Sequence, residues 1–227
     1  MSADAARAVP AAATASVCWL GLVPYVPIWQ RMQAYATVRT PGDPDQIWCL
    51  EHPPVYTLGA NARREHVLAP GDIPVVPVDR GGQVTYHGPG QLVVYPLIDL
   101  RRRALGIRDL VTALESSVIE SLSGEGIAAV ARRDAPGVYV QGAKVASIGL
   151  RVRRHSSYHG LSVNVAMDLG PFAGINPCGY AGLAVTDLAT LGVHTAPRAF
   201  AQQLIPLLWH RLGLEGAPNW VDEPCDV

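Results

Sequence analysis

The feature that most limits how this chain can fold is the segment 92–98, an almost unbroken run of apolar residues. Such a run is typical of a central strand covered on both faces, because a strand with one solvated face alternates apolar and polar residues. Segments 138–140, 144–152 and 158–165 follow as three antiparallel strands with short connections. We therefore expect a sheet in the middle of the chain, with other elements packed against both of its faces.

Helical patterns lie before, within and after this group of strands, and no internal repeat or linker interrupts the order. A hydrophobic content of 49% with 16% charged residues is typical of a packed globular domain. The sequence predicts one α+β domain with a mixed β-sheet flanked by helices. The expected helices are 24–39, 107–122 and 197–212, and further short strands are expected at 17–23, 46–50, 55–59 and 73–78.

The two ends of the chain differ from its middle. We expect a disordered tail over 1–15, the folded domain over 16–215 and a C-terminal tail over 216–227. Residues 8–30 carry no charged side chain, but prolines interrupt this stretch and no basic segment precedes it. Neither a signal peptide nor a membrane association is therefore expected.

Charge and cysteine usage restrict the class of protein. A net charge of −1 gives no general attraction to nucleic acid or to an anionic membrane. The four cysteines have no metal-type spacing and no close pairing, which favours free thiols in a reducing cytoplasm. Arginines cluster at 101–103, 132–133 and 151–154, either as solvated ends of elements or as a docking patch for an acidic partner.

Cys178 has the sequence setting most suited to chemistry. Pro177 restricts the residue before it, and Gly179 permits backbone angles that other residues avoid. This predicts a shaped loop that presents a thiol, although a cysteine in such a turn can also be an inert small hydrophobe.

Lys144 is the only lysine in the chain, since the other 17 basic residues are arginine. Arginine stays protonated at any working pH, whereas a desolvated lysine can release its proton. Alternation along the predicted strand puts Lys144 on the apolar face, with Ala146 and Ile148. We expect a partly desolvated amine that can act as a base, the alternative being a surviving surface lysine.

Segment 80–91 holds four glycines between strands, which would let a ligand approach the backbone closely. It matches no phosphate-binding glycine pattern, so nucleotide binding has little support. His87 and His159 could pair with Cys178 as in a thiol hydrolase, or with it bind zinc, but no short signature of either kind is present.

Four segments together resemble the lipoate-protein ligase B family, the octanoyl-[acyl-carrier-protein]:protein octanoyltransferases. They are RGGQVTYHGPGQ (80–91), GAKVASIGLRV (142–152), HGLSVNV (159–165) and INPCG (175–179), in the order of the family. The similarity runs from about residue 19 to 212. The sequence departs from the family pattern at Ala143, at Val145 and at 173–174. These departures remove no reacting group and bear on the preference for acyl chain length.

The resemblance implies the fold of the biotin and lipoate protein ligase catalytic domains. It implies octanoyl transfer from octanoyl-acyl carrier protein to a lysine of lipoyl domains, in 2-oxoacid dehydrogenase complexes and the glycine cleavage H protein, with no cofactor, metal, nucleic acid or membrane. Cys178 takes the nucleophile position and Lys144 that of its partner. The acyl site is implied to include Arg80, Gly81, Gly82, Gln83, Val84, Thr85, Tyr86, His87, Ser147, Ile148, Gly149, Gly160, Leu161 and Ser162.

This chemistry needs a thiolate and a group that moves protons. A thiol and an amine in contact can exchange a proton to give a thiolate–ammonium pair, and the thiolate can then attack a thioester. Backbone N–H groups near Gly179 or in the Arg80–Gly82 turn are the expected oxyanion donors. The alternatives are an ATP-dependent lipoate or octanoate ligase and a non-catalytic carrier-binding module.

Overall fold

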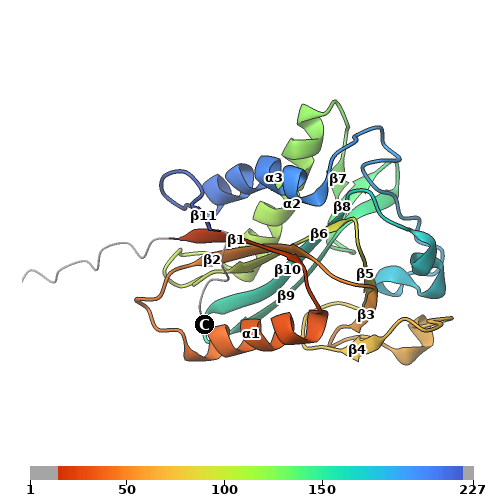
Figure 1. Cartoon of the computed structure of the whole chain (residues 1–227), viewed down its shortest axis with the longest axis horizontal. Helices are drawn as coiled ribbons and strands as arrows, with labels where there is room; N and C mark the ends of the chain where they lie inside the picture. The colour runs from red at the N-terminus through yellow and green to blue at the C-terminus, as the bar shows by residue number, and fades with distance from the viewer. Residues whose placement is uncertain (1–14, 222–227) are drawn as a thin grey trace, which may run out of the picture.

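Eight strands form one mixed sheet in the computed structural model, which describes residues 15–221 (Figure 1). Their order is β11-β1-β2-β6-β10-β9-β8-β7. Strand β1 pairs in parallel with β2 and β11, and the other neighbours are antiparallel. The elements are β1 (Ser16–Leu22), α1 (Tyr25–Val38), β2 (Gln46–Glu51), β3 (Val55–Leu58), η1 (Arg64–His66), β4 (Val75–Pro77), β5 (Val84–His87), β6 (Gln91–Leu97), α2 (Ile107–Gly124), β7 (Val130–Ala131), β8 (Gly137–Val140), β9 (Ala143–Arg153), β10 (Ser156–Asn164), η2 (Gly170–Gly174), η3 (Pro177–Gly179), α3 (Pro197–Arg211) and β11 (Trp220–Val221).

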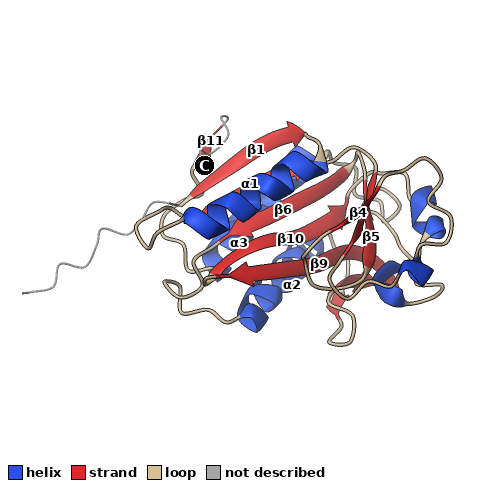
Figure 2. Ribbon diagram, turned by 90° about the horizontal axis from the view of Figure 1, so that it is seen from below, coloured by secondary structure: helices blue, strands red, loops and turns tan. Residues whose placement is uncertain are grey.

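Strand β6 lies in the interior of the sheet, between β2 and β10, and all of its residues are buried. Helices α2 and α3 cover one face of the sheet and α1 covers the other (Figures 1 and 2). The alternation of a strand divides the core accordingly. Leu92 and Val94 pack on the side of α2 and α3, whereas Val93 and Tyr95 pack on the side of α1. The predicted central strand and the α+β class are confirmed.

A second sheet, in the order β4-β3-β5, lies beside one end of the main sheet (Figure 1). The sequence does not predict strand β5, because its residues lie within the glycine-rich segment 80–91. Its residues Val84–His87 pair antiparallel with β3 and are all buried. This pairing partner lies about thirty residues earlier in the chain, so local sequence does not reveal it.

The face of Lys144 differs from the prediction. Tyr139 pairs with Lys144 and Val138 pairs with Ala146, so β9 contains one extra residue, Val145, opposite β8. Such a bulge breaks the alternation of side chains. Lys144 therefore lies on the side of Tyr139 and not with Ala146 in the core under α2 and α3. It is nevertheless 2% exposed, so the expected burial is confirmed.

The C-terminal residues also differ from the prediction. Trp220 and Val221 form β11 beside β1, so part of segment 216–227, expected to be a tail, extends the main sheet. The predicted N-terminal tail lies outside the described residues, apart from Ala15. Cys18 is disulfide-bonded, which corrects the expectation of four free thiols, while Cys49 is free and buried. No helix within residues 15–221 is long and apolar enough to cross a membrane.

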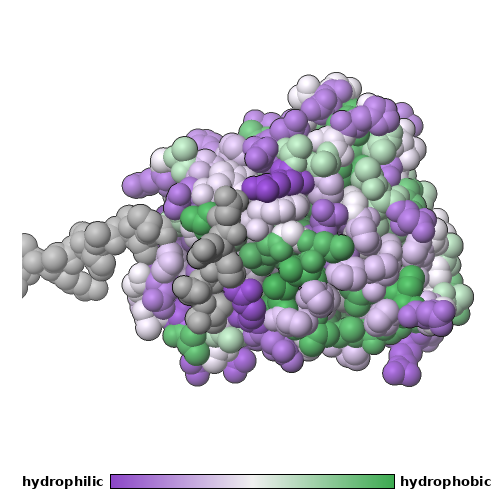
Figure 3. Space-filling model, in the orientation of Figure 1, coloured by the Kyte–Doolittle hydropathy of each residue, from purple (hydrophilic) through white to green (hydrophobic). Residues whose placement is uncertain are grey.

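The basic run at 101–103 has a structural role. Arg103 and Arg39 hydrogen-bond to the buried carboxylate of Asp45, and Arg102 lies 2.6 Å from it. These contacts tie the β6–α2 connection to the start of β2. On the face shown in Figure 3, apolar side chains gather over β1 and the start of α1, where Leu22 and Val26 are exposed.

Candidate active site

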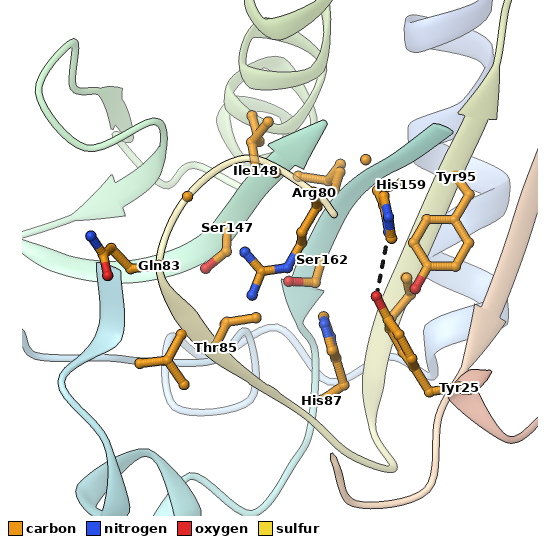
Figure 4. A pocket seen from close by; sticks show the side chains of 16 residues that line it. Tyr25, Arg80, Gln83, Thr85, His87, Tyr95, Ser147, Ile148, His159 and Ser162 are labelled. Carbon is orange, nitrogen blue, oxygen red and sulfur yellow. Dashed lines mark hydrogen bonds between the residues drawn. The ribbon is translucent and has the colours of Figure 1, made fainter. Parts of the chain in front are cut away.

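One cavity brings together most of the residues predicted to line an acyl site (Figure 4). We call it the inner cavity. It lies between segment 80–87 and the paired strands β9 and β10, where Ser147 faces Ser162 across the ladder. Of the predicted lining residues, only Gly81 and Tyr86 do not line it. Tyr86 packs instead with Tyr56 and Phe172.

Arg80 is held in place at one wall of the inner cavity. Its guanidinium donates to the carbonyl and hydroxyl oxygens of Thr57 and to the carbonyl oxygen of Gly81. The loop is pinned to β9 because the Gly81 N–H donates to the Leu150 carbonyl at 2.9 Å. A Cβ at Gly149 would lie 3.0 Å from the Gly81 oxygen. The glycines therefore allow the loop to lie tightly against β9.

The floor of the inner cavity contains residues that the sequence analysis missed as lining: Tyr25, Val93, Tyr95 and His159. The hydroxyl of Tyr25 lies 3.3 Å from Nδ1 of His159, as the dashed line in Figure 4 shows. Tyr25 is 134 residues from His159 in the chain, so no local signal predicts this contact. For His159 a signal existed, since it precedes Gly160 in one of the four motifs.

Asp79 supports the floor from behind. Its carboxylate accepts hydrogen bonds from Trp29, Gln33, Tyr158 and His159. Burial raises the pKa of this carboxyl, but the four donors outweigh burial and bring the pKa below its ordinary value. The φ of +56° at His159 lies in the left-handed region, and the hydrogen bond to Asp79 holds the imidazole in a fixed orientation.

Two buried histidines, His87 in the cavity lining and His52 beside it, are neutral near pH 7. Burial lowers the pKa of His87 to about 3 and that of His52 to about 4. His87 Nδ1 lies 2.7 Å from the Gln91 side-chain oxygen, and His52 Nε2 lies 2.9 Å from the Tyr95 hydroxyl. Because these polar groups bond to one another, the floor can accept an apolar ligand without leaving them unsatisfied.

Lys144 lies near the inner cavity but does not line it. Its Nζ donates to the Pro136 carbonyl at 2.9 Å and lies 5.3 Å from the centre of the Tyr139 ring. Gly137 has a φ of +141°, and a Cβ there would lie 2.6 Å from Lys144 Cε. Glu115 on α2 accepts the Gly137 N–H at 2.9 Å. Pro136 and Gly137, which contact the lysine side chain, are thus anchored to α2.

The segment with Cys178 runs alongside Lys144. Cys178 is the middle residue of η3, and its side chain lies outside what the structure describes. Farther along, the Lys144 N–H donates to Ala184 and the Lys144 carbonyl accepts from Thr186. A Cβ at Gly179 would lie 3.3 Å from Gln83, a lining residue of the inner cavity. The backbone therefore brings segment 178–186 beside both Lys144 and the cavity.

Two of the expected oxyanion donors, the amides of Gly81 and Gly179, are already engaged. The Gly81 N–H donates to Leu150, and the Gly179 N–H donates to Asn176 at 2.9 Å. Neither amide is available to a developing oxyanion in this conformation. No cluster of three or more His, Cys, Asp or Glu suited to a metal occurs among the described side chains, which do not include that of Cys178.

Comparison with known proteins agrees with this geometry. The sequence model of the lipoyl protein ligase A/B catalytic domain family matches residues 26–207. An octanoyltransferase of Alkalilimnicola ehrlichii is 64% identical over 79% of this chain and 83% of its own length. That of Cellvibrio japonicus is 56% identical over 86% of this chain and 92% of its own.

Solved structures share the fold at low sequence identity. A Thermoplasma acidophilum lipoate protein ligase with bound lipoic acid superposes with a TM-score of 0.72 at 14% identity, covering 92% of this chain and 90% of its own. The biotin protein ligase of Aquifex aeolicus gives 0.55 at 13% identity, covering 87% and 68%. The expected fold is confirmed, and the chain belongs to the lipoyl protein ligase A/B catalytic domain family, among relatives that are octanoyltransferases.

Proposed function

We propose that this protein transfers an octanoyl group from octanoyl-acyl carrier protein to a lysine of lipoyl domains. The observation that carries the proposal is the identity of up to 64% to octanoyltransferases over most of both chains. The inner cavity supports it, because Val93, Ile148 and Leu161 give it apolar surface that suits a hydrocarbon chain, and the buried histidines beside it bond to other side chains.

The proposed reaction proceeds through Cys178. Its thiolate attacks the carbonyl carbon of the donor thioester, and the bond to the phosphopantetheine sulfur breaks as the acyl-Cys178 thioester forms. The Lys144 ammonium gives a proton to the departing sulfur. The acceptor amine then attacks the acyl-Cys178 carbonyl, Lys144 takes up the proton from the amine, and the Cys178 thiolate leaves.

The surroundings of Lys144 fit this role. The side chain is buried, and its Nζ donates to the Pro136 carbonyl and lies 5.3 Å from the centre of the Tyr139 ring. A lysine amine held in one place beside the segment that carries Cys178 can give up a proton and take one up within one catalytic cycle.

The proposal also names partners and location. The donor is the octanoyl-acyl carrier protein, and the acceptors are lipoyl domains of 2-oxoacid dehydrogenase complexes and the glycine cleavage H protein. We place the enzyme in the cytoplasm. A reducing compartment would keep Cys18 as a thiol in the cell, although the structure has it disulfide-bonded.

Intact-protein mass spectrometry tests the proposal. The enzyme is mixed with octanoyl-acyl carrier protein without an acceptor, and peptide mapping locates any added group. We expect one octanoyl group on Cys178, its release by a lipoyl domain, and no labelling of Cys178→Ser. Active enzyme without this adduct would refute the intermediate. A requirement for ATP would indicate a ligase, and binding without transfer would indicate a carrier-binding module.

A further inference from the structure

Two further hollows extend from the inner cavity toward the surface. The first, which we call the middle cleft, shares Gly82, Gln83 and Ile148 with the inner cavity and also reaches Pro136 and Tyr180. The second, the outer groove, shares Ile107, Val111 and Pro136 with the middle cleft. The three form one path along α2 that passes the Pro136 carbonyl, the acceptor of the Lys144 hydrogen bond.

The outer groove carries positive charge. Arg108 from the first turn of α2 and Arg132 and Arg133 from beyond β7 line it, and all three are exposed. Arg132 pairs with Asp134 at 2.6 Å. Among the described residues, Arg108 and Arg133 form no ion pair. The one carboxylate lining the groove, Glu115, accepts the Gly137 N–H. Two guanidinium groups are thus available to an anion.

The middle cleft carries an unsatisfied acceptor. The side-chain oxygen of Gln83 is buried and has no hydrogen-bond partner among the described residues. Because a buried polar atom without a partner is costly, such an atom at the wall of a cleft points to a ligand that donates a hydrogen bond there. Amide N–H groups are donors of this kind.

We propose that the outer groove and middle cleft bind the phosphopantetheine arm of the acyl donor, with Arg108 and Arg133 contacting its phosphate. This inference rests on the proposed function, which supplies a donor carried on such an arm. The path presents positive charge at its mouth, a hydrogen-bond acceptor at Gln83 and apolar surface in the inner cavity. An acylated phosphopantetheine arm has its phosphate, its amides and its acyl chain in the same order.

The charge of the groove favours the donor over the acceptor. An approaching lysine is cationic in water and would be repelled by Arg108 and Arg133, whereas a phosphodiester would be attracted to them. Guanidinium groups also match the oxygens of a phosphate in two-point contacts. The acceptor lysine therefore reaches the site from another side.

Steady-state kinetics with three donors tests the proposal: octanoyl-acyl carrier protein, octanoyl-phosphopantetheine and octanoyl-pantetheine, which lacks the phosphate. For Arg108→Ala/Arg133→Ala we expect KM for the two phosphate-bearing donors to rise by about tenfold or more, as for loss of charged hydrogen bonds. The KM for octanoyl-pantetheine, the KM for the lipoyl domain and kcat should stay unchanged. The rise should shrink at high salt.

Arg101→Ala/Arg153→Ala is the matched control, because it removes the same charge from exposed arginines that line none of the three hollows. A rise in KM for octanoyl-acyl carrier protein alone would overturn the phosphate contact. It would indicate instead that the two arginines contact the protein surface of the carrier. An equal rise for all three donors, a higher KM for the lipoyl domain, or no change would also overturn the proposal. All of these kinetic outcomes are measured in active enzyme. They are therefore distinguishable from failure of the proposed function, which would appear as wild-type protein that forms no Cys178 adduct.

Discussion

Replacing Gly137 by alanine should disable Lys144 while leaving the chain folded. The new Cβ would lie 2.3 Å from the Ala146 carbonyl oxygen and 2.6 Å from Lys144 Cε. Backbone contacts below 3.0 Å cannot persist, so β8 and β9 would separate at this point. The φ of +141° is in addition one that alanine rarely adopts.

The cost in stability has two parts. A residue held in a sparsely populated backbone region costs about 1–3 kcal/mol. Overpacking at a buried site adds about 1–3 kcal/mol. We therefore expect the free energy of unfolding to fall by about 2–6 kcal/mol, measured by urea denaturation, against a total of about 5–15 kcal/mol for a typical protein. Most molecules should remain folded at 25 °C.

The effect on the rate should be larger than instability explains. If the clash displaces Lys144 Nζ by about 1 Å, kcat should fall by about 100-fold, the usual result of such a misplacement. Single-turnover transfer from octanoyl-acyl carrier protein to Cys178 measures this step directly. Activity is compared at temperatures where circular dichroism shows the variant to be folded.

Gly142→Ala separates backbone strain from the clash. Gly142 lies in the β8–β9 turn with a φ of +85°, but a Cβ there would meet no atom within 4 Å. This control should lose about 1 kcal/mol of stability, as expected for strain alone, and keep the wild-type rate. If Gly137→Ala also kept the wild-type rate, the claim that Gly137 shapes the lysine site would be refuted.

Four further results are expected. Lys144→Arg should lose nearly all turnover, because arginine keeps its charge but cannot cycle a proton. Glu115→Ala should lower kcat about tenfold, because the hydrogen bond that holds the turn beside Lys144 is lost, whereas Glu115→Gln, which can still accept the Gly137 N–H, should keep kcat near wild type. Iodoacetamide should label Cys178 before Cys49, which is buried and whose pKa burial raises. Stability should fall as pH drops from 6.5 toward 4, by about 1.4 kcal/mol per pH unit for His87 alone, because its pKa of about 3 lies below that of an unfolded histidine and the unfolded chain binds the extra proton.

Each of these results has an outcome that contradicts it. Near-normal turnover by Lys144→Arg would exclude the acid–base role, and equal loss in Glu115→Gln and Glu115→Ala would exclude positioning through the hydrogen bond. Equal labelling of both thiols would argue against an activated Cys178. Urea denaturation at several pH values measures the last prediction, with the exposed His194→Gln as a control expected to leave the slope unchanged. A stability that stays constant on acidification would mean that the histidines are not held neutral.

Local pattern was sufficient for the main elements. The apolar run at 92–98 predicted the central strand, and the three expected helices occur within two residues of their predicted ends. These signals are strong because burial on one or both faces imposes a period on consecutive residues. Four motifs also identified most of the cavity lining, since the wall of the inner cavity comes from continuous segments of β5, β9 and β10.

Contacts between distant segments decided the rest. The bulge at Val145 depends on pairing of β9 with β8, and it moved Lys144 from the predicted face to the side of Tyr139. Tyr25 reaches the cavity floor only because α1 packs against β10. The sequence alone determined which elements form and which reactive groups are present, because both depend on neighbouring residues. The tertiary structure determined which face each group occupies and what surrounds it, because hydrogen bonds and packing across the sheet join residues far apart in the chain.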